Sequence, residues 1–262
     1  MSAPPTFQLT RGGIPLFVSF PHSGTYIPPQ IAERMTPVAL TTPDTDWHVP
    51  KLYAFLDAMG ASRIEATHSR YVVDLNRPPD DQELYAGQKK TGLVPADTFK
   101  GEPLYREGHA PSGEEIADRR KYWQPYHDAL AQELSRLKAV HGSVILWDAH
   151  SIESVLPALF DGPLPDLNLG TFDGKSCDKD IAEATFAAAQ TTGFSAVLNA
   201  RFKGGHITRS YGDKKKGINA IQLDMAQAIY MDEGPPFTYR PDRAAKVIAA
   251  IRTMIRATLD VL

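Results

Sequence analysis

Two histidines and two aspartates stand at positions where they could bind one metal ion together. His22 and His150 each follow a short apolar segment typical of a buried strand, and Asp44 and Asp46 share the motif Thr-Pro-Asp-Thr-Asp-Trp-His. Two imidazoles and one carboxylate, with a fourth position left open, form a ligand set of catalytic zinc sites, where bound water has a pKa of about 7. The residue types therefore suit metal-assisted hydrolysis.

These residues meet only if the segments before them are strands of one sheet. Residues 14–20 and 143–147 have the apolar character of buried strands, and open α/β sheets bind ligands beyond the carboxyl ends of their strands. Asp148 is placed to accept a hydrogen bond from the imidazole of His150. Polar residues end strands in every α/β protein, however, and the sequence has no HExxH or CxxC motif. A metal site and ordinary turn residues both fit these observations.

A second group of polar residues suits the binding of a carboxylate. The motif Ser-Arg-Tyr-Val-Val-Asp-Leu-Asn-Arg-Pro contains Arg70, Asn76 and Arg77, whose side chains offer several hydrogen-bond donors. The alternative is that Arg70 simply pairs with a surface group, as Asp74 four residues later also could. If residues 71–75 form an interior strand, the first interpretation gains weight, because buried arginines need partners.

Strands and helices are expected to alternate along the chain. Further strands are expected at 61–67, 71–75, 196–199 and 220–223, and helices at 50–58, 113–139, 178–192 and 240–262. Ser112 and Glu115 form a capping box before the longest helix, which Pro125 should kink or divide. This alternation predicts a layered α/β domain with a mixed or largely parallel sheet.

A long polar stretch interrupts this pattern. Residues 78–112 are rich in proline, glycine and charge, and the stretch is longer than most structureless connections in compact domains. Its position directly after the second polar group predicts a flap or insertion within a single domain of residues 1–262. Lys89, Lys90 and Arg106 are candidates for further contacts with an anion, although solvated side chains are the simpler interpretation.

Composition narrows the classes of protein to consider. A net charge of -3 and a pI near 6.2 give no basic surface for nucleic acid or an anionic membrane. Cys177 is the only cysteine, so no intrachain disulfide is expected. The chain starts without the pattern of a signal peptide and has no run of about 18 apolar residues, so we expect a cytoplasmic protein. A serine hydrolase is disfavoured because GxSxG is absent, and the sequence does not indicate the oligomeric state.

Several motifs in a fixed order give the sequence a family resemblance. They are His-Ser-Gly at 22–24, Asp-Thr-Asp-Trp-His at 44–48, Ser-Arg-Tyr-Val-Val-Asp-Leu-Asn-Arg-Pro-Pro at 69–79, Asp-Ala-His-Ser at 148–151, Gly-Gly-His-Ile-Thr-Arg at 204–209, Gln-Leu-Asp-Met-Ala-Gln at 222–227 and Tyr-Met-Asp-Glu at 230–233. Together they resemble the N-formylglutamate amidohydrolase family. That family is similar to zinc carboxypeptidases and aspartoacylases, which implies a three-layer αβα sandwich of the zinc exopeptidase type.

The resemblance implies one zinc ion per chain, with other divalent metals possible. It makes His22 and His150 ligands and Asp46 the third ligand, with Asp44 as its rival. The carboxypeptidase pattern has a glutamate ligand three residues after the first histidine, and this sequence has Thr25 there. The carboxylate must therefore come from another part of the chain.

The resemblance also implies residues that bind the substrate. Arg70, Asn76 and Arg77 match the positions that hold the substrate carboxylate in the aspartoacylase-like group, with one residue fewer between Arg70 and Asn76. Arg209 resembles a later arginine suited to the polarised carbonyl or to a substrate carboxylate.

The position of the general base departs from the family pattern. The aspartoacylase-like group has a late glutamate on a strand, and the corresponding residue here is Asp224. Its side chain is one methylene shorter, so either the local backbone compensates or another acid, such as Glu233, takes the role.

The activity implied is hydrolysis of a small anionic substrate, N-formyl-L-glutamate, to formate and L-glutamate during histidine degradation. One alternative keeps the metal and the fold but changes the substrate, as in a related N-acyl amino-acid hydrolase or a carboxypeptidase-like enzyme. The other is a non-catalytic binder of an anionic metabolite, which the aspartate at Asp224 would fit.

Overall fold

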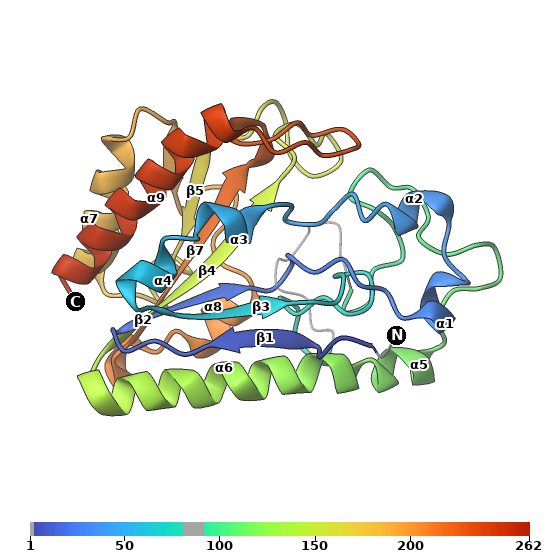
Figure 1. Ribbon diagram of the computed structural model, residues 1–262, viewed down its shortest axis with the longest axis horizontal. Coiled ribbons are helices and arrows are strands. Elements are labelled where there is room, and N and C mark those ends of the chain that lie inside the picture. Colours follow the sequence, from blue (N-terminus) through green and yellow to red (C-terminus); the bar gives the residue numbers. More distant parts are fainter. Residues whose placement is uncertain (1–2, 81–91) are drawn as a thin grey trace.

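A mixed sheet forms the centre of the protein. The computed structural model describes residues 3–80 and 92–262, and within them the strands are β1 (Phe7–Thr10), β2 (Leu16–Phe20), β3 (Ser62–Ala66), β4 (Val144–Ile152), β5 (Leu167–Gly170), β6 (Ala196–Leu198) and β7 (Ile218–Ala226). These described strands form one seven-stranded sheet in the order β1-β3-β2-β4-β7-β5-β6 (Figure 1). Strands β3, β2, β4 and β7 are mutually parallel, as are β5 and β6, whereas β1 and β3, and β5 and β7, pair in antiparallel fashion. The expected mixed, largely parallel sheet is confirmed.

Helices cover both faces of this sheet. They are α1 (Pro29–Ala32), α2 (Pro37–Leu40), α3 (Val49–Leu52), α4 (Leu56–Met59), α5 (Gly113–Asp118), α6 (Arg120–His141), α7 (Lys179–Gln190), α8 (His206–Tyr211) and α9 (Pro241–Asp260), with 3-10 turns η1 (Lys214–Lys216) and η2 (Gln227–Ile229). Figure 1 shows α7 and α9 on one side of the sheet and α6 on the other. The expected three-layer αβα arrangement is confirmed.

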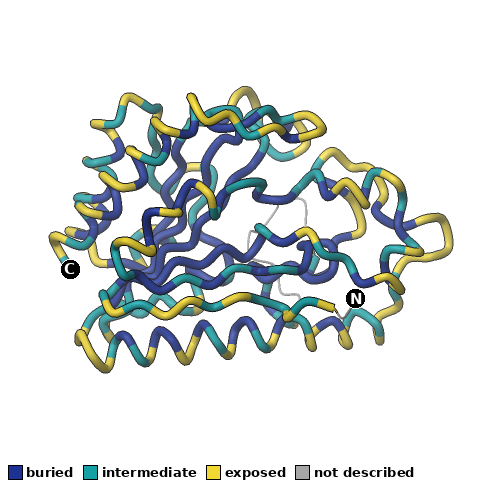
Figure 2. Tube along the Cα trace, in the orientation of Figure 1, coloured by how far each residue is buried: buried dark blue, intermediate teal, exposed yellow. Residues whose placement is uncertain are grey.

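Alternate residues of the central strands serve the two layers. On β4, Ile145 and Trp147 pack with α3, α4, α7 and α9, whereas Val144 and Leu146 pack with α6 and α8. A strand buried on both faces is continuously apolar, which explains the strong sequence signal of β4. The sheet lies in the buried interior, and exposed residues gather on the outer sides of the helices (Figure 2).

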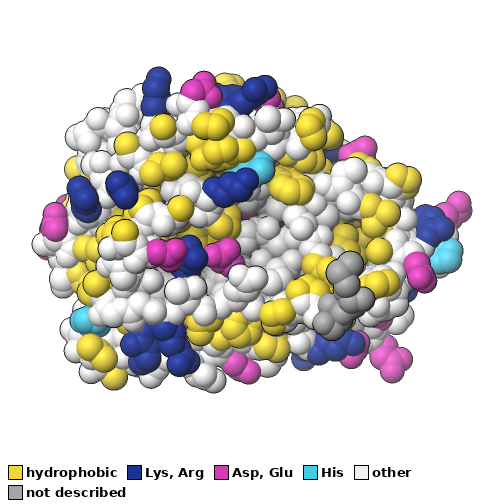
Figure 3. Space-filling model, viewed as in Figure 1, with side chains coloured by type: hydrophobic (Ala, Val, Ile, Leu, Met, Phe, Trp, Pro, Cys, Tyr) yellow, Lys and Arg dark blue, Asp and Glu magenta, His cyan; other side chains and the backbone are white. Residues whose placement is uncertain are grey.

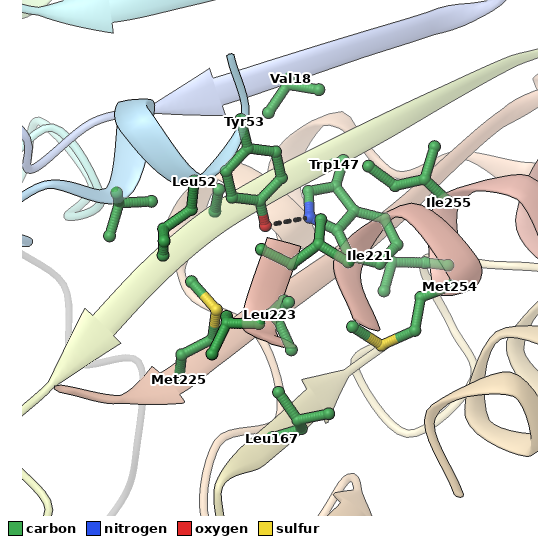
Figure 4. Packing of buried hydrophobic residues seen from close by; sticks show 14 of the residues in the cluster. Val18, Leu52, Tyr53, Trp147, Leu167, Ile221, Leu223, Met225, Met254 and Ile255 are labelled. Carbon is green, nitrogen blue, oxygen red and sulfur yellow. Dashed lines mark hydrogen bonds between the residues drawn. The ribbon is translucent and has the colours of Figure 1, made fainter. Parts of the chain in front are cut away.

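A polar contact lies within the larger apolar layer. The hydroxyl of Tyr53 accepts a hydrogen bond from Trp147 Nε1 at 2.9 Å, and both side chains are fully buried among residues such as Ile221 and Met254 (Figure 4). A buried indole N–H needs such a partner, because an unpaired one would lose its bond to water without compensation.

The long helical region divides earlier than expected. The break lies at Arg119, between α5 and α6, and α6 continues through Pro125. Arg119 is buried and donates to Val72 O at 2.9 Å and to Glu115 at 2.6 Å. These contacts favour a break at Arg119, whereas α6 continues through Pro125, whose missing N–H leaves one helical hydrogen bond unmade. Ser112 accepts from the Glu115 N–H at 3.2 Å, so the expected N-cap is present.

The predicted strand at 71–75 is wrong. The chain turns there although the residues are buried, because local hydrogen bonds replace a strand ladder. The N–H of Val72 donates to Ser69 O at 2.8 Å, that of Asp74 to Leu93 O at 2.8 Å, and that of Arg77 to Asp74 O at 3.2 Å. Burial of apolar residues thus reflects packing into the core and not pairing in the sheet.

Other differences concern short or terminal pieces of structure. The region 50–58 forms two short helices, α3 and α4, where one was expected. Strands β1 and β5, each of four residues, were not predicted, because so short a segment carries little periodicity. Strands β4 and β7 extend beyond their predicted ends, to Ile152 and Ala226, so they carry His150 and Asp224 within the strands.

The described part of the stretch 78–112 packs against the region of the candidate site. Leu93 and Phe99 both contact it, as detailed below, while Leu104 and Tyr105 pack with Met35 near α1 and α2. Lys89 and Lys90 lie outside the described residues. The role of the stretch as a flap stays a prediction.

No helix within residues 3–80 and 92–262 is long and apolar enough to span a membrane. On the face seen in Figure 3, basic and acidic side chains are interspersed with hydrophobic ones.

Candidate metal and substrate site

His22, Asp46 and His150 converge in the interior of the protein. One potential ligand atom from each lies within 4.8 Å of the others, and all three side chains are buried. Asp46 Oδ2 lies 3.1 Å from His150 Nδ1 and 3.7 Å from His22 Nδ1. The two imidazole rings have centroids 4.9 Å apart. Two nitrogens and one oxygen in this arrangement could bind a divalent metal.

Neighbouring strands bring these residues together. His22 lies in the turn directly after β2, and His150 lies within β4, which is paired with β2 in parallel. The sequence had suggested that His150 follows its strand. The structure instead places it inside β4. Asp46 comes from a separate turn, and its N–H donates to His22 O at 3.0 Å. This backbone hydrogen bond attaches the turn to the end of β2.

A second carboxylate orients each imidazole. His22 Nε2 lies 2.7 Å from Asp74 Oδ1, and His150 Nε2 lies 3.1 Å from Asp148 Oδ2. Both Nδ1 atoms are then turned toward Asp46. Hydrogen bonding of the outer nitrogen to a carboxylate fixes the tautomer and the ring orientation of metal-binding histidines in other proteins. The contact of Asp148 with His150 agrees with the prediction, whereas the corresponding role of Asp74 was missed.

Asp74 links His22 to Arg70. Its Oδ2 accepts from Arg70 Nη2 at 2.7 Å, and its Oδ1 also accepts from the N–H of Asn76 at 2.9 Å. Burial alone would raise the pKa of Asp74, but His22 and Arg70 lower it well below its usual range. Asp74 therefore remains ionised. Its position four residues after Arg70 was visible in the sequence, but the contact with His22 joins residues 52 apart and leaves no local signal.

Burial and nearby charges shift the pKa values of the two imidazoles in opposite directions. Burial and the charge of Arg70 lower the pKa of His22. Burial also acts to lower the pKa of His150, but Asp148 and Asp46 overcome it and raise that pKa well above its usual value. The carboxylates of Asp46 and Asp148 thus favour a positive charge at the position of the His150 ring.

Asp44 points to other partners. Its Oδ2 accepts from the Tyr71 hydroxyl at 2.7 Å and from the N–H of Phe99 at 2.9 Å. Burial raises its pKa despite these hydrogen bonds. Among the described residues, the potential metal-binding group contains Asp46 and not Asp44.

Asp224 lies beside His150 in the sheet. The two residues are directly paired between β7 and β4, so their side chains share the face of the sheet that also bears Asp148. Asp224 accepts a hydrogen bond from Gln222 Nε2. Burial raises the pKa of Asp224 to about 6. A carboxyl group with that pKa can accept and return a proton near neutral pH.

Glu233, the alternative acid, is engaged in holding backbone. Its Oε1 accepts from the N–H groups of Ser154 and Ala228 at 2.6 and 2.9 Å, and its Oε2 accepts from the Ser154 hydroxyl at 2.7 Å. These contacts favour Asp224 over Glu233 as the proton acceptor.

Two of the predicted substrate-binding residues, Arg70 and Arg77, differ in how far they are buried. Arg70 is buried, pairs with Asp74 and has its guanidinium carbon 4.7 Å from the centre of the Phe99 ring. The alternative that Arg70 pairs with a surface group is wrong, because its partner is the buried Asp74. Arg77 is half-buried, at the end of the same loop.

Asn76 and the Gly-Gly motif connect the loop to α8. Asn76 Nδ2 lies 3.0 Å from His150 Nε2, and its Oδ1 accepts from the N–H of Ile207 at 2.8 Å. A Cβ atom on Gly205 would come within 2.4 Å of Asn76 Nδ2, so only glycine allows this approach. Arg209 Nε donates to Gly204 O at 2.7 Å, and its guanidinium lies over the Phe172 ring.

Comparison with known proteins identifies the family. The family model described as N-formylglutamate amidohydrolase matches residues 14–231. The chain belongs to the N-formylglutamate amidohydrolase family. The resemblance carried by the motifs is thereby confirmed.

Named members of this family are similar over nearly their whole length. Proteins named N-formylglutamate deformylase from Pseudomonas putida and Pseudomonas aeruginosa are each 52% identical to this chain, over 254 and 256 residues respectively. Each match covers 95% of this chain and 94% of the relative.

Solved structures show the same fold. An N-formylglutamate amidohydrolase from Ralstonia eutropha JMP134 superposes with a TM-score of 0.82 at 23% identity, covering 98% of this chain and 97% of the other. A gene product from Agrobacterium tumefaciens gives a TM-score of 0.73 at 16% identity, covering 98% and 96%. The family fold therefore extends over the whole described chain.

Proposed function

We propose that this protein is a metal-dependent hydrolase that cleaves N-formyl-L-glutamate to formate and L-glutamate. The observation that carries the proposal is the 52% identity with proteins named N-formylglutamate deformylase, over 95% of this chain. The buried group of His22, Asp46 and His150 supplies a chemical basis for the reaction.

The proposed cofactor is one divalent metal ion, with zinc as the first choice. Its ligands are His22, Asp46 and His150, and their donor types fit zinc, because the site combines two imidazole nitrogens with one carboxylate oxygen. Asp74 and Asp148 lie 2.7 and 3.1 Å from the outer nitrogens, the arrangement that orients metal-binding histidines in other proteins. A metal bound there would polarise the formyl group and make water more acidic.

Asp224 is the proposed general base. Its side chain shares a sheet face with His150, and its pKa of about 6 leaves it ionised at neutral pH. In the proposed reaction it accepts a proton from the attacking water and returns a proton to the amine nitrogen of the departing glutamate. The hydrogen bond from Gln222 holds the carboxylate in place.

Four polar side chains are proposed to bind the substrate. Arg70, Asn76 and Arg77 would hold its carboxylates, and Arg209 would donate to the formyl oxygen as negative charge develops on it. A well-placed donor to such an oxygen contributes about 3 kcal/mol to transition-state stabilisation. Arg70 is held by Asp74 and lies over Phe99, so its guanidinium is already ordered before any substrate arrives.

The test is release of formate from N-formyl-L-glutamate by the purified protein. Metal content is measured on the same sample, and a chelator-treated portion is assayed before and after zinc is added back. We expect about one metal ion per chain and activity that disappears and returns with the metal. Cleavage of other N-acyl amino acids in preference to N-formyl-L-glutamate would exclude the proposed substrate and retain the reaction class. A protein that binds no metal and releases no formate would rule out the proposal.

The cellular setting is part of the proposal. Histidine degradation is the proposed route because it is the one that the family resemblance implies. The cytoplasm as location stays a prediction.

A further inference from the structure

The segment that follows β7 holds the turn that carries Asp46. Gln227 Nε2 donates to the backbone carbonyl of Thr45 at 3.0 Å. The Tyr230 hydroxyl donates to the carbonyl of Trp47, also at 3.0 Å. These carbonyls belong to the residues on either side of Asp46, so the backbone of the carboxylate residue is attached at both flanks to side chains from a distant part of the sequence.

Ser151 connects the same two side chains to β4. Its Oγ lies 3.3 Å from Gln227 Nε2 and 2.7 Å from Tyr230 Oη. All three side chains are buried. Because Ser151 directly follows His150, this hydrogen-bond network joins the strand of one imidazole to the turn of the carboxylate. Neither the proposed general base nor the proposed substrate-binding arginines belong to this network.

Two residues of the turn have backbone angles that such residues disfavour on their own. Thr42 and His48, near its two ends, have φ angles of 47° and 63°, in the left-handed region that non-glycine residues disfavour. The same C-terminal segment supports it again, because His48 Nε2 donates to Phe237 O at 2.7 Å. The Trp47 and Phe237 rings also stack with centroids 5.3 Å apart. Local hydrogen bonds such as that from the Trp47 N–H to Thr45 O, at 2.8 Å, are thus supplemented by contacts from outside the turn.

We propose that Gln227, Tyr230 and Ser151 are positioning residues that set the Asp46 carboxylate at the correct distance from the two imidazoles for a metal ion. This inference rests on the metal site proposed above and assigns a task to Gln227 and Tyr230, two residues that the proposed reaction itself does not use. Metal–ligand distances tolerate a deviation of only about 0.2 Å, so a small displacement of the turn weakens binding.

The experiment measures zinc affinity of the metal-free protein by competition with a chromophoric chelator. The variants are Tyr230→Phe, Gln227→Met and Ser151→Ala, each of which removes one member of the network. Each should weaken zinc binding by on the order of tenfold, as loss of the outer partners of metal ligands does elsewhere. Urea unfolding of the metal-free forms shows which of the three variants fold. Each variant that folds is a separate test of the inference.

Tyr53→Phe is the matched control. It removes a buried hydroxyl whose hydrogen-bond partner is Trp147 Nε1 and not a backbone group of the turn, so it should lower stability and leave zinc affinity unchanged. If Tyr53→Phe weakens zinc binding as much as Tyr230→Phe, general destabilisation explains the effect and the inference is wrong.

Asp46→Ala separates this inference from the proposed function. If Asp46→Ala loses zinc binding while Tyr230→Phe, Gln227→Met and Ser151→Ala bind zinc as the unaltered protein does, the positioning role is overturned and the metal site stands. If Asp46→Ala binds zinc as tightly as the unaltered protein, both proposals fail. Weakened binding in Asp46→Ala and in the three network variants, with Tyr53→Phe unaffected, supports both.

Discussion

At the scale of single residues, burial determines what Asp224 can do. Its pKa of about 6 makes it a stronger base than an exposed aspartate, and it lies next to His150 on the same sheet face. An aspartate at this position, where the aspartoacylase-like group has a glutamate, does not by itself argue for a binding protein.

The first prediction concerns the pH dependence of catalysis. Asp224 must be ionised to accept a proton, so kcat/KM for N-formyl-L-glutamate should fall as the pH falls through about 6. A nearby cation lowers this pKa, so the acid limb of the holoenzyme should lie at or below that value. Asp224→Asn should reduce kcat by about a hundredfold or more. The measurement is a pH profile of formate release.

Glu233→Gln is the comparison for this prediction. Glu233 binds the Ser154 and Ala228 N–H groups, so its substitution should lower stability and leave the acid limb in place. An acid limb that moves in Glu233→Gln, or nearly full activity in Asp224→Asn, would transfer the role of base to another residue.

The second prediction concerns Asp74, which serves both a histidine and an arginine. Asp74→Asn leaves the buried Arg70 without its carboxylate, and the free energy of unfolding should fall by about 3–5 kcal/mol. It also weakens the acceptor for His22 Nε2, so zinc affinity should fall by about ten- to a hundredfold. Urea unfolding and chelator competition measure the two effects.

A double variant distinguishes these two tasks. Arg70→Met combined with Asp74→Asn removes the unpaired charge, so part of the lost stability should return while zinc affinity stays low. Recovery of zinc affinity together with stability would mean that Asp74 acts on the site only through the general stability of the fold.

At the scale of elements, α6 supports the loop that carries Asn76. Trp123 Nε1 donates to Arg77 O at 3.0 Å, and His127 Nε2 lies 2.8 Å from Leu75 O. Burial lowers the pKa of His127 to about 3, so the ring stays neutral at physiological pH. The helix therefore holds the carbonyls on both sides of Asn76, much as Gln227 and Tyr230 hold those beside Asp46.

The third prediction tests this support. Trp123→Phe keeps an aromatic ring and removes the N–H donor, so the free energy of unfolding should fall by about 1 kcal/mol. KM should rise more than kcat falls, because the loop carries the proposed carboxylate-binding residues. Steady-state kinetics of formate release with urea unfolding gives both values. Gln124→Ala, at an exposed position of α6, is the control, and equal changes in both variants would count against a specific support.

At the scale of the whole molecule, the proposed metal site joins parts of the chain that are far apart. The ligand residues come from the end of β2, a separate turn and the interior of β4, and the packed layers on both sides of the sheet keep them in place. A metal that binds only the folded state must therefore stabilise the whole domain.

The fourth prediction is a measurable gain in stability from metal. Zinc at a free concentration about 100 times its dissociation constant should raise the free energy of unfolding by about 2.7 kcal/mol. Thermal unfolding with zinc and with chelator measures the change. His22→Ala should unfold at the same temperature in both conditions, and a shift as large as that of the unaltered protein would place the metal elsewhere.

The sequence by itself determined the family, the layered α/β class and most of the major elements. The family motifs consist of residues that are adjacent in the sequence, so they can be recognised without a structure. Continuous apolar segments such as 14–20 and 143–147 identify buried strands, because both faces of the sheet are covered. The long helix near 113–139 was also predicted, although it divides at Arg119, where a buried side chain makes contacts that no local pattern displays.

Only the tertiary structure decided which residues meet. Asp44 and Asp46 are equivalent in the sequence, but the pairing of β2 with β4 and the attachment of the turn bring Asp46 to the histidines, while Asp44 contacts Tyr71. The contact of Asp74 with His22 and the turns at 71–75 were likewise hidden. Local patterns report which residues prefer burial or a given backbone shape, whereas contacts between distant residues depend on strand register and packing of the whole chain.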